Sequence, residues 1–175
     1  MDTVFGKVTI YAESGAKSRA SVYLNSDGSF NAMEFRKELF SNAEDFASFH
    51  TYSVIVSSDE NIRKAMSEVG FIVRDIARVN KPLHLMLPGW QIAALDTLCK
   101  DKYINFSRSD LINKVILDNL PSIPPEYPYE KNMSKTTFTI NPVALNGIES
   151  FETSRTRNHL IYDYISEFLE RNACN

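Results

Sequence analysis

The sequence lacks the motifs that mark the common classes of enzyme. It has only six glycines, and none of them falls in the G-x-x-x-x-G-K or G-x-G-x-x-G spacing that cradles phosphates in nucleotide-binding proteins. The catalytic strings G-x-S-x-G and H-E-x-x-H are also missing. The acidic pairs Glu44-Asp45 and Asp59-Glu60 fall at predicted helix starts or in loops, where the helix dipole accounts for them. We therefore expect no enzymatic activity.

Long apolar runs and cysteine frameworks are absent as well. No apolar run approaches the roughly 18 residues that a membrane span needs, and the N-terminus carries an early acid instead of the basic start of a secretory signal. Cys99 and Cys174 have neither the spacing of a metal site nor that of a disulfide framework, and the three histidines share no ligand spacing. These features predict a cytoplasmic protein without membrane association, cofactor or metal.

The chain also lacks a strong positive charge. Its formal net charge is −3, and residues 1–80 hold 9 basic against 11 acidic residues. Residues 81–120 hold 5 against 4, and residues 121–175 hold 5 against 7. This balance argues against tight non-specific binding to nucleic acid, which depends on neutralising many phosphates. Any contact with a polyanion must depend on the local arrangement of charges.

The most strongly patterned stretch of the sequence is residues 81–120. It opens with a period of two, typical of a half-buried strand, in which Leu83, Leu85 and Leu87 alternate with Pro82, His84 and Met86. Pro88 then stands where a helix can begin without losing a needed N–H. Apolar residues recur at helical spacing as far as Cys99, and Ser107 opens a second helix that stops before Pro121. The predicted order is strand, helix, turn, helix.

A divergent copy of this pattern follows in residues 135–175. Phe138 and Ile140 alternate with threonines, and Asn141-Pro142 reads as a helix N-cap with proline at the first helical position. The run from Thr156 to Ile161 falls in register with the run from Ser107 to Ile112. The first helix of this copy looks about one turn shorter. Since a lone strand with two helices cannot bury its apolar face, we expect the two copies to pair, within one chain or between chains.

The order of elements, with Leu87-Pro88 at the strand end and the string SRSDLI at the second helix start, resembles the ribbon–helix–helix family of DNA-binding proteins. The resemblance covers about 40 residues in each copy. It implies an α+β fold in which tandem ribbon–helix–helix units form an intramolecular pseudo-dimer after a separate N-terminal α+β domain. It also implies no catalytic role for any residue.

In this family the two-stranded ribbon lies in the major groove, and its outward side chains read base edges. The resemblance therefore implies base contacts from the outward positions, which are His84, Met86, Lys135, Thr137 and Thr139. Lysine reaches guanine acceptors and threonine offers a hydroxyl and a methyl, whereas Pro82 and Met86 offer only apolar contact. The alternative for the threonines is an ordinary solvent-facing role, and for His84 it is simple surface exposure.

Family members also clamp the DNA backbone through the start of the second helix, where N–H groups and the helix dipole favour a phosphate. The implied phosphate contacts are Ser107, Arg108, Ser109, Arg155, Thr156, Arg157 and Asn158. Ser107, Ser109 and Thr156 are predicted helix caps in either case. The arginines are solvated surface charges in the alternative interpretation, with Asp110 neutralising Arg108. Trp90 is interpreted as a core or interface residue.

Two further segments complete the predicted organisation. Residues 121–134 hold four of the seven prolines and predict an extended spacer, with a reach of roughly 40 Å. In residues 1–80, strands are predicted over Val4–Ala12, Arg19–Leu24 and His50–Ser57. One helix is predicted after Asn31 and another from Ser58 through Ile76, with a change from helix to strand near Phe71 as the alternative.

These features predict a sequence-specific DNA-binding protein of plasmid or phage type. It would act as a transcriptional repressor or as an accessory factor for DNA transfer, in contact with a relaxosome component. A homo-oligomer through residues 1–80 is a further expected association. The alternatives are an antitoxin-type autoregulator that binds a toxin, and a protein-interaction scaffold without DNA binding.

Overall fold

The computed structural model describes residues 3–11, 17–29, 31, 54–68, 70–79 and 82–173. The chain divides into two compact units, Met1–Asn80 and Lys81–Asn175. The helix predicted after Asn31 and the beginning of the strand predicted from His50 lie outside the described residues. Among the described residues, none of the helices is both long and apolar enough to cross a membrane.

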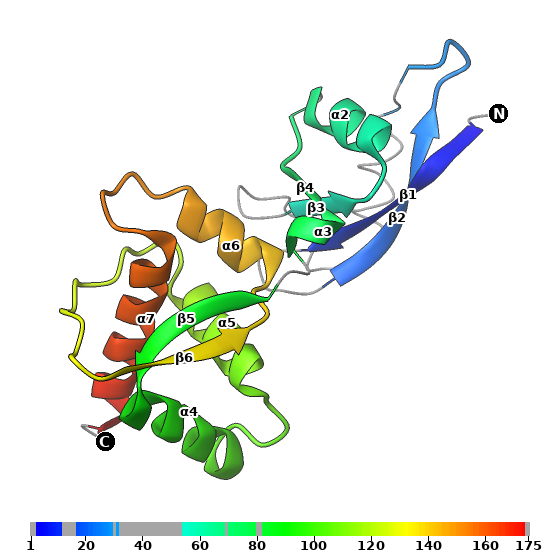
Figure 1. The fold of residues 1–175 in the computed structure, drawn as a ribbon. Coiled ribbons are helices and arrows are strands. Elements are labelled where there is room, and N and C mark those ends of the chain that lie inside the picture. The colour runs from blue at the N-terminus through cyan, green and yellow to red at the C-terminus, as the bar shows by residue number, and fades with distance from the viewer. Residues whose placement is uncertain are drawn as a thin grey trace. The chain divides into compact units, whose positions relative to one another are not determined.

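The first unit is built on a four-stranded sheet of order β2-β1-β3-β4 (Figure 1). Its described elements are β1 (Thr3–Tyr11), β2 (Lys17–Leu24), β3 (Val54–Ser57), α2 (Glu60–Glu68), β4 (Val73–Asp75) and α3 (Ile76–Val79). Strand β1 runs antiparallel to β2 and β3, and β4 runs parallel to β3. The hairpin predicted from the two N-terminal strands is confirmed.

The predicted helix from Ser58 through Ile76 is wrong, because α2 ends at Glu68. Gly70 has a φ of +90°, a conformation that glycine adopts without strain. The Gly70 N–H donates to the Ser67 carbonyl at 3.0 Å and the Phe71 N–H to the Met66 carbonyl at 3.1 Å, the pattern of a Schellman cap. The chain then enters β4, so the alternative of a change from helix to strand near Phe71 is confirmed.

Strand β1 has a glycine, Gly6, where the Ile62 side chain of α2 packs closely against the sheet. A Cβ added at Gly6 would lie 2.4 Å from the Ile62 side chain, which is closer than atoms can approach. Gly6 also follows a register shift in the pairing of β1 with β2. The helix contributes Ile62 and Met66 to a core that includes Val8, Ile10, Ala20, Val22, Ile55 and Phe71.

The second unit repeats the order strand, helix, helix. Its elements are β5 (Leu83–Pro88), α4 (Gly89–Asp101), α5 (Arg108–Asn119), β6 (Met133–Phe138), α6 (Pro142–Glu149) and α7 (Arg157–Ala173). Strands β5 and β6 pair antiparallel within the one chain and form a two-stranded sheet (Figure 1). The predicted strands and helices of both copies are therefore confirmed, and α6 is shorter than α4, with 8 residues against 13.

The two copies differ by one residue at the start of their first helix. Asn141 caps α6 with its side chain and Pro142 is the first helical residue, as predicted. Pro88, by contrast, is the N-cap of α4 and not its first residue, which is Gly89. When the two N-caps, Pro88 and Asn141, are aligned, Met86 and Thr139 each stand two residues before the cap and are equivalent. In this alignment the exposed positions of one strand match the exposed positions of the other.

One buried core joins all the elements of the second unit. Leu85 and Leu87 from β5, Phe138 from β6 and Leu95 from α4 are at most 2% exposed. The helices add a set of aliphatic side chains at three- and four-residue spacing, namely Leu111, Ile112, Val115, Ile116, Leu145, Ile148, Leu160, Ile161 and Ile165. The cluster draws on both copies, and α5 contacts α6 and α7 of the other copy, so the apolar faces of the two copies are buried together.

The segment predicted as an extended spacer has neither helix nor strand over residues 121–132 and is fastened along α7, while Met133 and Ser134 already belong to β6. The Tyr162 and Tyr164 hydroxyls donate to the carbonyls of Pro128 and Ser122 at 2.9 and 2.6 Å. The Tyr127 N–H donates to the Asp163 carboxylate at 2.9 Å. A proline-rich segment has few N–H groups to pair with a strand, so side chains of the helix satisfy its carbonyls instead.

Candidate nucleic-acid interface

The two-stranded sheet of β5 and β6 has one buried face and one exposed face. All five predicted base-contact residues are exposed, namely His84, Met86, Lys135, Thr137 and Thr139. The residues between them, including Leu85, Thr136 and Phe138, are at most 6% exposed. The alternation of a strand thus separates the two sets, and the structure brings the predicted set together on a single surface, called the ribbon face below.

The register places the ribbon-face residues in pairs across the sheet. His84 lies opposite Thr137, with 3.0 Å between His84 Nδ1 and the Thr137 hydroxyl, and Met86 lies opposite Lys135. The five residues offer an ammonium group, an imidazole, two hydroxyls and several methyl groups, and no carboxylate. Donors, acceptors and methyl-binding groups of this kind match the base edges in a major groove.

The starts of α5 and α7 bond to the backbone of the ribbon, at Thr139 and at His84. The Ser109 hydroxyl accepts the Thr139 N–H at 3.1 Å, and the Asn113 side chain donates to the Thr139 carbonyl at 2.8 Å. In the other copy the Asn158 side chain donates to the His84 carbonyl at 3.1 Å. Ser109 is therefore not a helix cap, and Ser109 and Asn158 each bind the strand of the opposite copy. Their common position two residues after the helix cap was the sequence signal for this role.

Two equivalent ion pairs fix the arginines that follow the helix caps. Arg108 forms a bidentate pair with Asp96, at 2.9 and 2.8 Å, and donates to the Thr136 hydroxyl at 2.8 Å. Arg157 lies 3.9 Å from Glu149. Asp96 and Glu149 both stand eight residues after the N-cap of their helix, so each copy has the same pair. The Arg108 side chain is 31% exposed and the Arg157 side chain 42%.

The Asp96–Arg108 pair predicts a specific pH dependence. Hydrogen bonding to Arg108 lowers the pKa of Asp96 below its ordinary value of 3.8. A carboxyl with a lowered pKa stabilises the fold above that value and loses its contribution as the pH falls. We expect Asp96→Asn to flatten the decline of the melting temperature on the acid side of about pH 4, relative to wild type. An unchanged slope in thermal melts at pH 3 to 7 would rule out this pair as a source of acid sensitivity.

The starts of α5 and α7 differ in charge. At α5, Asp110 binds the cap residue Ser107 and does not neutralise Arg108. The Asp110 carboxylate accepts from the N–H and the hydroxyl of Ser107, both at 2.8 Å. The Ser107 hydroxyl in turn accepts the Asp110 N–H. At α7 the Thr156 hydroxyl accepts the His159 N–H at 3.2 Å, and the first turn carries no acidic residue. A phosphate therefore meets less repulsion at α7 than at α5.

Arg155 does not lie where a phosphate contact needs it. Its side chain is 14% exposed and forms a 2.5 Å ion pair with Asp163, which is fully buried. Its second terminal nitrogen donates to the Pro124 carbonyl at 3.0 Å. Arg155 thus secures the proline-rich segment against α7, and we exclude it from the phosphate contacts proposed below. No sequence pattern linked these residues, because they come from three separate segments.

The described residues contain no group of three or more histidine, cysteine, aspartate or glutamate side chains that could hold a metal ion. No model of a known protein family matches the sequence, no curated protein matches it, and no solved structure matches its fold.

Proposed function

We propose that residues 81–175 are two divergent ribbon–helix–helix units paired within one chain, and that they bind double-stranded DNA in a sequence-specific manner. The observation that carries this proposal is the ribbon face, where two paired strands expose polar and basic side chains and bury the alternate positions. A twisted two-stranded ribbon fits the major groove, where each base pair presents a distinct pattern of donors and acceptors.

Three features of the second unit support the proposal. The contacts of Ser109 and Asn158 with the opposite strand hold the ribbon rigidly, as precise base recognition requires. The Thr156–Arg157 start of α7 combines a first helical turn without acidic residues with an exposed guanidinium, which suits a backbone phosphate. The pairing of the strands within one chain allows binding as a single chain, without dimerisation.

The differences between the copies indicate an asymmetric DNA site. Around the central pair of His84 and Thr137, one copy contributes Met86 and Pro82, and the other contributes Lys135 and Thr139. The first set makes apolar contacts and the second makes hydrogen bonds, so the two halves favour different bases. We infer a repressor or a DNA-transfer accessory factor, with the first unit available for oligomerisation or for a partner protein.

The proposal is tested by selection from a random pool of double-stranded DNA at about 100 mM salt, where exposed charges are already partly screened. Recovery of a short motif with unlike halves is the expected result. Enrichment without a motif would indicate backbone binding alone. No enrichment would contradict the proposal and favour the protein-interaction scaffold, which has no DNA affinity to lose as salt rises.

Arg157→Ala is expected to weaken binding to every DNA sequence alike, because a phosphate contact carries no base information. Loss of one phosphate contact should reduce the slope of log K against log salt by about 1. Fluorescence anisotropy over a salt series measures both quantities on a selected and a scrambled duplex.

Arg171→Ala provides the matched control, since Arg171 lies in the last turn of the same helix. It should leave both affinity and salt slope unchanged. A loss for Arg157→Ala that is confined to the selected duplex would contradict the phosphate role.

A further inference from the structure

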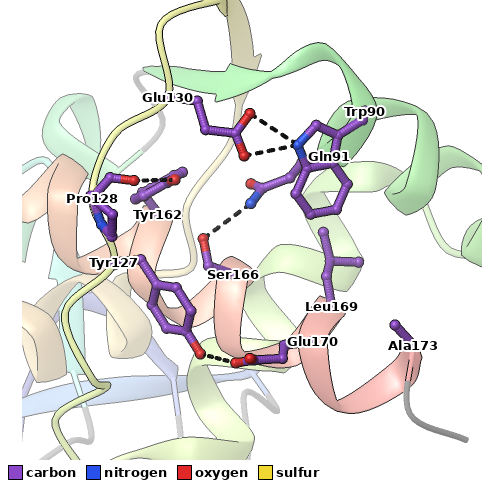
Figure 2. Close-up of a pocket in the computed structure, with 10 residues that line it drawn as sticks. All are labelled: Trp90, Gln91, Tyr127, Pro128, Glu130, Tyr162, Ser166, Leu169, Glu170 and Ala173. Carbon is purple, nitrogen blue, oxygen red and sulfur yellow. Dashed lines mark hydrogen bonds between the residues drawn. The ribbon is translucent and has the colours of Figure 1, made fainter.

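A pocket of about 390 Å³ lies between the start of α4, the proline-rich segment and α7 (Figure 2). Its walls are aromatic and aliphatic: Trp90 from α4, Tyr127 and Pro128 from the proline-rich segment, and Tyr162 and Leu169 from α7. A volume of this size is typical of small-molecule sites. None of these residues belongs to the ribbon face.

Of the two roles predicted for Trp90, core or interface residue, the core role is wrong, since Trp90 is 55% exposed at the edge of the pocket. Its indole N–H donates to both carboxylate oxygens of Glu130, at 3.0 and 3.1 Å. Figure 2 shows the indole nitrogen directed toward Glu130, so this contact fixes the ring that lines the pocket. An aromatic ring exposed in this way offers a face for an apolar group or a cation.

Gln91 is a buried polar residue of the pocket lining. The residue is 1% exposed, and its side-chain nitrogen donates to the Ser166 hydroxyl at 3.0 Å. Its side-chain oxygen is buried and has no hydrogen-bond partner. An unpaired buried carbonyl oxygen is unfavourable, so a ligand that donates an N–H to it gains affinity.

The second copy shows that the fold does not need this polar residue. Gln91 stands three residues after the N-cap of α4, and the residue three after the N-cap of α6 is Ala144. Ala144 is fully buried in the core, and so is Val143, the counterpart of Trp90. An amide and an indole at these positions of α4 are therefore specific to the first copy, where they contact Ser166 and Glu130 at the pocket.

The charge of the pocket selects the class of ligand. Among the described residues that line it, Glu130 and Glu170 are the ionisable carboxylic acids, and none is lysine, arginine or histidine. The Tyr127 hydroxyl donates to Glu170. This hydrogen bond raises the pKa of Tyr127 to about 12, so Tyr127 stays neutral at physiological pH. A buried acceptor, two carboxylates and an exposed indole together favour a cation with an apolar body.

We propose that this pocket binds a small primary amine, whose apolar body packs against Trp90 and Leu169 and whose ammonium group donates to Gln91 and Glu130. The site lies apart from the ribbon face, and the proposal does not depend on DNA binding. An amine bound here would contact α4, the proline-rich segment and α7 at once, because each contributes to the walls.

Trp90 reports binding directly, since it is the single tryptophan of the chain. The full-length protein is titrated with 2-phenylethylamine, and its fluorescence is compared with a titration by the neutral analogue 2-phenylethanol. We expect a saturable change with the amine, with a Kd of about 1 mM, which is reasonable for nine non-hydrogen atoms. The alcohol should bind about tenfold more weakly, because it lacks the charge-assisted hydrogen bonds.

Two variants test the assigned contacts. Glu130→Gln removes the charge and keeps an acceptor for Trp90, and Gln91→Leu removes the unpaired oxygen; each should weaken amine binding by about fivefold. Glu126→Gln is the matched control, because Glu126 is exposed on the same segment and does not line the pocket. It should bind the amine like wild type, and circular dichroism melts verify that all three variants are folded.

Equal affinity for the amine and the alcohol would overturn the proposed ligand class, since the pocket would then recognise only apolar surface. The absence of a saturable change with either compound would overturn the site itself. A response of Glu126→Gln as large as that of Glu130→Gln would show a general effect of surface charge and would also contradict the proposal.

Discussion

Replacing Thr137 and Thr139 together by alanine is expected to lower the affinity for the selected DNA sequence by about 10- to 100-fold. A good base contact contributes about 1–3 kcal/mol of discrimination, and 1.4 kcal/mol corresponds to a factor of ten. Both side chains are exposed on the ribbon face, and Ser109 and Asn113 hold Thr139 through its backbone only. The thermal stability should therefore change little, which melting curves recorded beside the binding isotherms verify.

Thr97→Ala is the matched control for this experiment. Thr97 is an exposed threonine on α4, away from the ribbon face, and its hydroxyl bonds only to the backbone of its own helix. Its loss should leave DNA affinity unchanged. If the double variant at 137 and 139 bound the selected sequence as tightly as wild type, the ribbon face would not be the reading surface.

Asp163→Ala is expected to cause the largest loss of stability in the second unit. Asp163 is fully buried, pairs with Arg155 at 2.5 Å and accepts the Tyr127 N–H. Removing it leaves the nearly buried Arg155 guanidinium without its counter-ion and the partly buried Tyr127 N–H without an acceptor. Breaking a buried ion pair in this way costs about 3–5 kcal/mol. Urea unfolding followed by Trp90 fluorescence measures the loss, because Trp90 reports on this unit.

An exposed ion pair in the same unit supplies the comparison. Lys114 and Asp118 lie 2.7 Å apart on α5, but their side chains are 41% and 57% exposed, so Asp118→Ala should cost only about 0.5 kcal/mol. The double variant Arg155→Met with Asp163→Leu should recover much of the loss, since it removes both charges and keeps apolar volume. A loss for Asp163→Ala as small as that for Asp118→Ala would contradict the interior role of the pair.

The strands and helices of the second unit could be predicted from the sequence, because the periods of helices and strands are local properties of the chain. The alternation around Leu83, Leu85 and Leu87 predicted β5 and its exposed face, and the caps Ser107 and Asn141 marked the starts of α5 and α6 correctly. The wrong end of the helix predicted from Ser58 through Ile76 also had a local signal. Gly70 at a left-handed position ends α2, and that glycine is visible in the sequence.

The partners of the polar side chains were beyond the reach of the sequence. Arg108 has Asp110 two residues away but pairs with Asp96, because Asp110 is engaged in the capping box. From the sequence, Arg155 was expected to be a phosphate contact or a surface charge beside a helix start. In the structure it points inward, because it pairs with the buried Asp163, eight residues later on α7. Such choices follow from which side chains the fold brings within hydrogen-bond distance.

The sequence by itself thus determined, in the second unit, the order of strands and helices, the repetition of that order and the residues of the ribbon face, all of which follow from short-range periodicity and capping. Tertiary structure alone decided the register of β5 against β6, the docking of the proline-rich segment on α7 and the pocket beside Trp90. The reason is physical: a period of two or 3.6 residues is set by neighbouring backbone geometry. Contacts between distant segments depend on how all the buried faces pack together.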